Sequence, residues 1–301
     1  MKVIPPIKVT DTILTVSGAA EPGAGEVLWN AATVYAVRQV AIRSTTHRRY
    51  ERTIAGTTAT PPESDAANWL DVGPTNRWAM FDTGRNTPTV ATSPFVVDLT
   101  PGRRINAVFL GGLDADTAEI TMLVGGQPVF TKLQNLMLRR TTSWYQYFYG
   151  EFKFQPSVVI FDLPPLSGAT IRLTLTNSRG PCKCASFVIG SAIDVGRVKY
   201  GAATEALNFS RIDRDVFGNV TLVPRRSVPG TQQTLIAPKA SVNILRDLRA
   251  QLNAVAAVWS GLDDASDGYF EPLLVYGIYR AFDINLSFLD NIEINLKLEE
   301  L

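Results

Sequence analysis

Few residues in this sequence have the types and spacing that catalysis or metal binding requires. The one histidine, His47, would have to shuttle the proton of a Ser-His-Asp triad, but the chain contains no G-x-S-x-G motif. The two cysteines, Cys182 and Cys184, are one residue apart, which is too close for an easy disulfide and leaves too few ligands for a metal ion. We therefore expect His47 on the surface, two small apolar thiols at the end of a strand, and no metal or other cofactor.

Acidic pairs are present as well, but a chain with 28 Asp and Glu residues offers such pairs by chance. Asp114 with Asp116, or Asp213 with Asp215, could supply the two carboxylates of a glycosidase. The segments that begin at Asp213 and Asp263 start like EF-hand calcium loops, but neither has the required glutamate at the twelfth position. The sequence also has neither a P-loop nor a G-x-G-x-x-G motif. It therefore predicts a protein that is not an enzyme.

The charges are nearly balanced, since 29 Lys and Arg residues against 28 Asp and Glu residues give a net charge of +1. This balance argues against broad electrostatic capture of nucleic acid or anionic lipid. We interpret the short basic clusters as solvated strand ends or inter-subunit ion pairs: His47-Arg48-Arg49, Arg103-Arg104, Arg139-Arg140 and Arg225-Arg226. The start of the chain lacks the features of a secretory signal, and no run approaches the about 18 apolar residues of a membrane span. We expect a soluble protein that is made in a cytoplasm and does not insert into membranes.

The composition is typical of a mainly β, multi-domain protein. Val, Ile, Thr, Phe and Tyr are abundant, 18 prolines and 22 glycines interrupt the chain, and 301 residues exceed the usual size of one β domain. Pro5, Pro6 and Pro22, with the glycines that follow, predict an irregular N-terminal arm over residues 1–24. Such an arm often lies on a neighbouring subunit.

A small β module built on aromatic packing is predicted over residues 25–75. Its pattern of aromatic, small and proline residues resembles the chitin-binding type modules of carbohydrate-binding family 5/12, at Trp29, Tyr35-Ala36, Val40, Tyr50-Glu51, Pro61-Pro62, Trp69 and Val72-Gly73. The resemblance implies sugar binding through Trp29, Tyr35, Tyr50 and Trp69 as one possibility. A retained scaffold for protein contact is the other, which we favour because the proline-rich loop carries no aromatic residue.

A β-sandwich is predicted over residues 76–195. Ile171, Leu173 and Leu175 alternate with polar residues, and INAVFLGG and SVVIFDLPP are short apolar runs ended by turn residues. Trp78, Met80 and Phe81 are expected to form the packing seam with the preceding module. An aromatic cluster lies within this region, and we interpret it as a buried strand in preference to an interface patch: Trp144, Tyr145, Tyr147, Phe148 and Tyr149.

A C-terminal α+β unit is predicted over residues 196–301. Apolar residues at spacings of three or four from Val242 to Val255 predict one amphipathic helix over Ser241–Ala256. The segments FDINLSF and IEINLKLEEL alternate apolar and polar residues around Leu289-Asp290-Asn291, which predicts a terminal hairpin with one wet face.

Three longer segments carry a second resemblance: WLDVGPTNRWAMFD, DLPPLSGATIRLTL and VGRVKYGAATEALNFSRIDRDVFGNVTLVPRRS. With the sandwich between them, they resemble tail-tip or baseplate proteins of long-tailed phages and prophages of Gram-negative bacteria. The resemblance implies a multi-copy virion tail protein whose central unit is a jelly-roll, galactose-binding-like domain. Its implied partners are copies of itself and other tail or baseplate proteins, with tail fibres as a further candidate.

Three functions are compatible with this sequence. We favour a structural tail subunit that pairs with its neighbours through the N-terminal arm and edge strands. The alternative is a receptor-binding adhesin that recognises host surface glycan through the N-terminal module or the central sandwich, including the Trp144–Tyr149 cluster. A glycan depolymerase has least support because the sequence has no visible repeat. Burial of Tyr50 and Trp69 would remove the best residues of the adhesin hypothesis.

Overall fold

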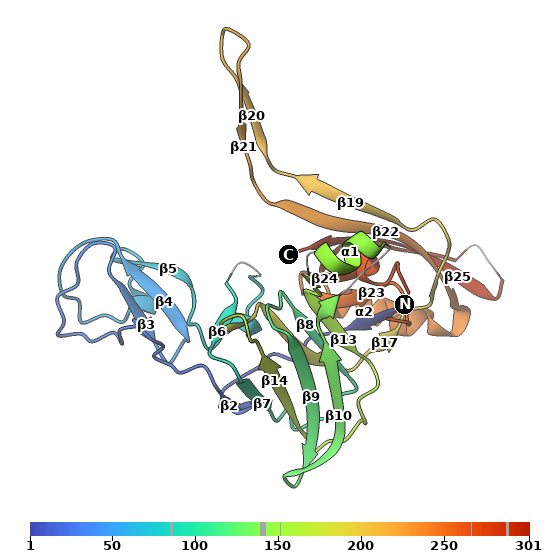
Figure 1. The fold of residues 1–301 in the computed structure, drawn as a ribbon, viewed down its shortest axis with the longest axis horizontal. Coiled ribbons are helices and arrows are strands. Elements are labelled where there is room, and N and C mark those ends of the chain that lie inside the picture. The colour runs from blue at the N-terminus through green and yellow to red at the C-terminus, as the bar shows by residue number, and fades with distance from the viewer. Residues whose placement is uncertain (85–86, 139–142, 151, 266, 287–288) are drawn as a thin grey trace. The chain divides into compact units, whose positions relative to one another are not determined.

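The computed structural model describes residues 1–84, 87–138, 143–150, 152–265, 267–286 and 289–301, and it confirms a mainly β, multi-domain fold (Figure 1). The chain divides into two compact units that are discontinuous in sequence. The first unit contains Met1–Ile7, Ile105–Ala107 and Ile189–Leu301, and the second contains Lys8–Arg104 and Val108–Val188. The sequence-based boundaries at 24/25, 75/76 and 195/196 therefore differ from this division, because strands from both ends of the chain complete the first unit.

An eight-stranded sheet forms the first unit, and every strand pair with a defined register is antiparallel. Its order is β17-β1-β23-β24-β25-β22-β18, and β19 also pairs with β22. The strands in this order are Ile193–Asp194, Lys2–Ile4, Ala257–Ser260, Leu274–Asn285, Asn291–Glu300, Ser227–Pro238 and Arg197–Val198, with β19 at Ala203–Asn208. The predicted terminal hairpin is present as β24 and β25, with Phe282 opposite Leu296 and Ile284 opposite Ile294.

One amphipathic helix, α2 (Val242–Gln251), belongs to this unit. Leu245, Leu248 and Leu252 are buried in the same core as Trp259 of β23. The helix was predicted to reach Ala256 but ends earlier. Ala254 has a φ of 57°, a left-handed conformation that cannot continue a right-handed helix.

Strands β1 and β25 are both inner strands of the eight-stranded sheet, and the position of β1 corrects the prediction of an irregular arm. The segment 1–24 was predicted to be an irregular arm, but Val3 and Ile4 are fully buried in β1, between β17 and β23. Strand β2 (Leu14–Ser17), from the same segment, joins a sheet of the second unit. The last strand, β25, lies between β24 and β22 and is not an edge. Proline content misled the prediction because the prolines at 5 and 6 follow β1 and do not interrupt it.

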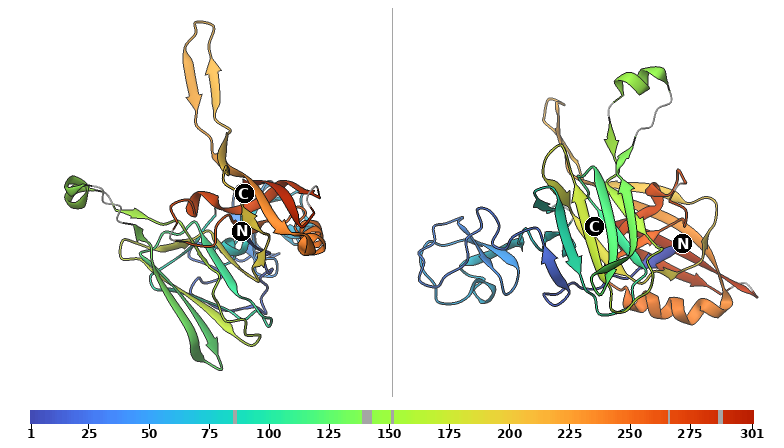
Figure 2. Two further views of the ribbon diagram at one scale, coloured as in Figure 1. Left: turned by 90° about the vertical axis from the view of Figure 1, so that its right-hand side faces the viewer. Right: turned by 60° about the horizontal axis from the view of Figure 1, so that its bottom comes forward.

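A five-stranded and a three-stranded antiparallel sheet form a sandwich-like core in the second unit (Figures 1 and 2). The larger sheet has the order β10-β9-β14-β7-β2, and the smaller has the order β13-β8-β16. In the smaller sheet, all of β13 but only residues 108–111 of β8 and 186–188 of β16 belong to this unit. As predicted, Ile171, Leu173 and Leu175 are fully buried in β14 while the polar residues between them are half-exposed. The further bounds are β9 Thr117–Val124, β10 Gln127–Asn135, β14 Thr170–Thr176, β7 Phe95–Leu99, β13 Ser157–Ile160, β8 Ala107–Gly111 and β16 Ser186–Gly190.

Three smaller sheets complete the second unit. The predicted aromatic module is the sheet β3-β4-β5 (Val40–Arg43, Arg48–Arg52, Trp69–Pro74). The cysteines lie in β15 (Cys182–Cys184), paired with β6 (Thr89–Ala91), and both are buried free thiols, as predicted. Strand β11 (Met137–Leu138) precedes helix α1 (Trp144–Tyr149), and strand β12 (Lys153–Phe154) follows it. The two strands pair in a short antiparallel ladder.

Candidate functional site

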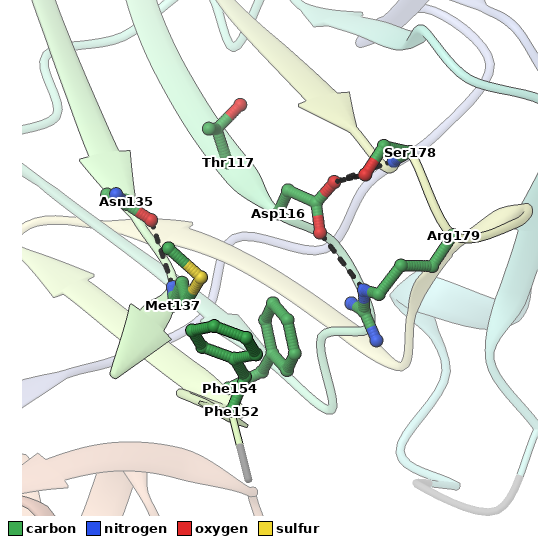
Figure 3. Close-up of a pocket in the computed structure, with 8 residues that line it drawn as sticks. All are labelled: Asp116, Thr117, Asn135, Met137, Phe152, Phe154, Ser178 and Arg179. Carbon is green, nitrogen blue, oxygen red and sulfur yellow. Dashed lines mark hydrogen bonds and ion pairs between the residues drawn. The ribbon is translucent and has the colours of Figure 1, made fainter. Parts of the chain in front are cut away.

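A pocket of about 390 Å³ lies where three strands of the five-stranded sheet begin or end (Figure 3). Three adjacent strands bring its residues together, because Asn135 pairs with Thr117 and Thr117 pairs with Thr176 in the ladders of β10, β9 and β14. Residues just outside these strand ends, together with the β11–β12 ladder, therefore converge. The lining residues are Asp116, Thr117, Asn135, Met137, Phe152, Phe154, Ser178 and Arg179.

The polar side of the pocket is a saturated ion-pair network. The Asp116 carboxylate accepts hydrogen bonds from the amide and the hydroxyl of Ser178, both at 2.6 Å, and from Nε of Arg179 at 3.1 Å. The Ser178 hydroxyl, then the Ser178 amide and Arg179, lower the pKa of Asp116. Asp114 is paired with Arg179 at 3.3 Å and with Lys183 at 3.1 Å. Two carboxylates thus face two cationic side chains. Because its pKa is lowered, Asp116 is poorly suited to donate a proton as a general acid.

The other side of the pocket is apolar. Phe154 lies under the Arg179 guanidinium, whose central carbon is 3.6 Å from the ring centroid. Phe152 and Met137 are 56% and 42% exposed, and Figure 3 shows the two phenyl rings side by side beside Met137. A pocket whose charges are paired, with an aromatic floor and a polar rim, suits a neutral ligand that has both an apolar face and hydrogen-bonding groups.

The four aromatic residues that the resemblance offers as a possible sugar site do not form an exposed platform. Tyr35, Tyr50 and Trp69 are 1%, 5% and 2% exposed and form the core of the small module, with Tyr35 and Trp69 edge to face at 5.0 Å. Trp29 packs against that core, and the Arg43 guanidinium covers its ring at 4.9 Å. A ring in a core cannot stack on a sugar, so Tyr35, Tyr50 and Trp69 serve in packing, while Trp29 is half-buried.

His47 was predicted to be a surface residue, and the structure corrects this. Its side chain is 18% exposed, with Nδ1 at 3.0 Å from the Glu21 carboxylate and Nε2 at 3.1 Å from the Asp11 carboxylate. The imidazole also stacks on Trp78, with ring centroids 4.1 Å apart. His47 is thus a packing and hydrogen-bonding residue.

The predicted seam after the small module is present. Trp78 and Met80 are buried, and Trp78 contacts His47 on one side and Phe81 edge to face at 5.8 Å on the other. Phe81 in turn contacts Phe187 of β16 at 6.1 Å. Aromatic contacts therefore connect the module to the sandwich core.

The aromatic cluster was predicted as a strand that covers both faces of a sheet, which is wrong. It forms the six-residue helix α1, and none of its residues is buried. The side chains most exposed are Trp144 at 79%, Tyr149 at 75% and Tyr145 at 73%. Ser143 explains the local helix start, because its side chain accepts a hydrogen bond from the Gln146 amide at 3.2 Å.

A second exposed feature is the β-ribbon, which we define as residues 203–228. It contains β19, β20 (Arg211–Arg214), β21 (Val220–Val223) and the start of β22, and it extends beyond the eight-stranded sheet of its own unit (Figure 1). Asp215 closes its tip by accepting from the amides of Phe217 and Asn219 at 2.9 and 2.8 Å. Asp213 pairs with Arg211 on the same strand. The acidic pair 213/215 is thus used in a turn and an ion pair.

Among the pocket residues, only Asp116 stands out in the sequence, as one member of an acidic pair with Asp114. The residues that share the pocket are distant in the sequence, so no local pattern links them. Among the described residues no group of three or more His, Cys, Asp or Glu is arranged to hold a metal ion. The same described residues include no helix that is long and apolar enough to cross a membrane.

Comparison with known proteins adds no assignment. No protein-family model matches the chain, and no curated protein matches it with significant similarity.

Proposed function

We propose that this protein is a structural subunit of a multi-protein assembly, and that the assembly is the tail tip or baseplate of a long-tailed phage. The observation that carries the proposal is the β-ribbon, whose residues are exposed almost throughout β19, β20 and β21. A two-stranded hairpin is marginally stable by itself in water. A projecting hairpin is expected to gain order from a surface that covers it.

One face of the ribbon is more apolar than the other. In the β20–β21 ladder Ile212 lies opposite Leu222, and these side chains are 62% and 69% exposed. The next pair on the same face is Val220, which is 52% exposed, opposite Arg214 towards the tip. The opposite face carries Arg211 opposite Val223 and, beside them, an Asp–Thr pair. This distribution is typical of a strand pair that packs one face against a partner.

The tip of the ribbon continues the apolar surface. Val216 and Phe217 are 93% and 87% exposed in the turn that Asp215 holds. Such exposure costs solubility unless the tip is covered. Together with the resemblance of the segment 195–227 to phage tail proteins, it supports insertion of the ribbon between neighbouring subunits, which are copies of this chain or other tail proteins.

The proposal is tested by deleting the gene from its phage and examining the particles by electron microscopy, with complementation by variants. The double variant Ile212→Ser/Leu222→Ser removes the apolar pair, and Arg211→Ser/Val223→Ser changes the opposite face at the neighbouring position. We expect malformed tail tips after deletion, rescue by the wild-type gene and by the opposite-face variant, and no rescue by the apolar-face variant. Normal tails without the gene, or full rescue by the apolar-face variant, would contradict the proposal.

A receptor-binding adhesin is the second candidate, and the pocket in the central sandwich favours it. Its aromatic floor and polar rim have the composition of a site for a neutral sugar. The variant Phe152→Ser removes an exposed floor residue without touching the core. We expect reduced adsorption by normal-looking particles and weaker binding of host surface polysaccharide to the purified variant in calorimetry. Unchanged adsorption and unchanged polysaccharide binding would remove this candidate.

A further inference from the structure

The core of the small module contains a cationic side chain that no acid in the described part of the chain neutralises. The side chains of β4 alternate, so Tyr50 and Arg52 face the core while Arg49 is exposed. Arg52 is only 2% exposed. Its backbone is used within the module, since its amide donates to the Gln39 carbonyl at 2.9 Å and its carbonyl accepts from the Arg38 amide at 2.8 Å. The register of β4 therefore places a positive charge inside the module.

The guanidinium of Arg52 is held by its face and unpaired along its edge. Its central carbon lies 5.0 Å from the ring centroid of Trp69, the residue opposite Arg52 in the β4–β5 ladder. Nε and Nη1 are enclosed and have no acceptor among the described residues. Nη2 keeps contact with solvent beside Gly56, where an added Cβ would lie 3.8 Å from it. The contact with Trp69 thus fixes the plane of the guanidinium and leaves its in-plane donors for a ligand.

The surroundings of Arg52 supply further donors instead of acceptors. The indole nitrogens of Trp29 and Trp69 are also enclosed, and neither has an acceptor among the described residues. Three acids of the module are paired with other side chains: Glu63, Asp65 and Asp71. A buried cation without a counter-charge destabilises a fold strongly. The module is therefore expected to gain stability from an anion that pairs with Arg52.

We propose that Arg52 forms a binding site for a carboxylate, which approaches Nη2 beside Gly56. A planar carboxylate matches the guanidinium fork, because its two oxygens can accept from Nη2 and one neighbouring nitrogen at the same time. A spherical anion such as chloride cannot form this pair of parallel hydrogen bonds. Two sources share the chemistry: a small organic acid in solution, and an aspartate or glutamate side chain of a neighbouring subunit. The first source needs no assembly, so the site is independent of the proposed function.

A purely structural role for Arg52 makes a different prediction. Its aliphatic stem could simply fill the core, with the charge neutralised by contact with Trp69 alone. Arg52→Met keeps an apolar stem and removes the charge. Under the proposal, this variant should unfold at the same urea concentration as the wild type or at a higher one when no carboxylate is present. The matched control is Arg49→Met, which removes the same charge from the exposed face of the same strand.

The experiment is titration of the full-length protein with sodium acetate, compared with sodium chloride at equal ionic strength. We expect acetate to raise the urea midpoint of the wild type and to shift the Arg52 Nε signal in a proton–nitrogen correlation spectrum. Arg52→Met should lose about tenfold or more in acetate affinity, and Arg49→Met should respond as the wild type does. Arg52→Lys keeps the charge but lacks Nε, so it assigns the signal and should also lose affinity if Arg52→Met does not fold.

A blocked Gly-Glu-Gly peptide and its Gly-Gln-Gly counterpart distinguish the two sources. Tighter binding of the glutamate peptide than of acetate assigns the site to a side chain of a neighbouring subunit, and the reverse order assigns it to a small acid. Equal effects of acetate and chloride, a glutamine peptide that binds as the glutamate peptide does, or an unchanged acetate response in Arg52→Met would each overturn the proposal. Normal tails in the deletion strain would contradict the assembly role and leave these results unaffected, so the two proposals are judged separately.

Discussion

Replacing Glu21 with alanine removes the acceptor that three side chains of the second unit share. The carboxylate is 5% exposed and accepts from Nδ1 of His47 at 3.0 Å, from the Thr75 hydroxyl at 2.8 Å and from Nε1 of Trp78 at 3.1 Å. These donors come from the β3–β4 turn and from the segment that follows the small module. Glu21 therefore fixes the module to the segment that precedes it.

The expected loss in the free energy of unfolding follows from the hydrogen-bond donors that Glu21→Ala leaves without an acceptor. Thr75 is fully buried and Trp78 is 8% exposed, so each loses a bond to a charged acceptor, which is worth about 1.5–3 kcal/mol in a buried position. His47 is 18% exposed, so water replaces part of its lost interaction. We expect Glu21→Ala to lower the free energy of unfolding by about 3–5 kcal/mol.

Urea denaturation followed by tryptophan fluorescence measures this change, and hydrogen exchange of the Trp78 indole locates it. The matched control is Glu63→Ala, which removes a surface ion pair with Arg43 and should cost about 1 kcal/mol or less. Equal effects of the two substitutions, or full protection of the Trp78 indole in Glu21→Ala, would refute the reasoning that Glu21 is a shared buried acceptor.

The remaining predictions concern the two cores and the pocket. Leu248→Ala should cost about 2–5 kcal/mol in urea denaturation, because Leu248 is 3% exposed in the core of the first unit. Because Ser178 holds the pKa of Asp116 below its usual value of about 4, the stability from Asp116 is present above that pH and is lost as the pH falls through the lowered pKa. Asp116→Asn should flatten the acid limb of a plot of stability against pH. Burial raises the pKa of the Cys184 thiol to about 12 and also raises that of Cys182, so a thiol reagent at pH 8 should label neither until the protein unfolds.

Each of these predictions has an outcome that contradicts it. Ile244, on the exposed side of α2, is the control for Leu248, and equal losses from the two alanine variants would show that α2 is not packed through its leucine face. An unchanged acid limb in Asp116→Asn would mean that the pocket network does not contribute to stability. Rapid labelling of the native protein would mean that β15 opens to solvent.

Local periodicity made part of the fold predictable. Period-two alternation identified β14 and the β24–β25 hairpin, and period-3.6 spacing identified α2, because each pattern records which side of an element faces a core. The aromatic packing of the small module was predictable for a similar reason, since many large rings within 45 residues have to bury one another.

Other features could not be read along the chain. The cluster at 144–149 reads as a buried strand because aromatic residues favour strands, but Ser143 caps a helix there and no second layer covers it. The prolines after Ile4 suggested an irregular arm, although β1 is completed by partners about 190 and 255 residues further along the chain, namely β17 and β23.

The sequence alone determined the fold class, the alternating strands, the amphipathic helix and the lack of a recognisable catalytic motif, because these depend on residue type and on spacing within one element. Tertiary structure decided which aromatic residues are available for binding: it buried Tyr50 and Trp69 and exposed Trp144. It also decided that Asp116 and Phe154 share one pocket, because strand order in a sheet brings distant segments together and no local spacing specifies that order.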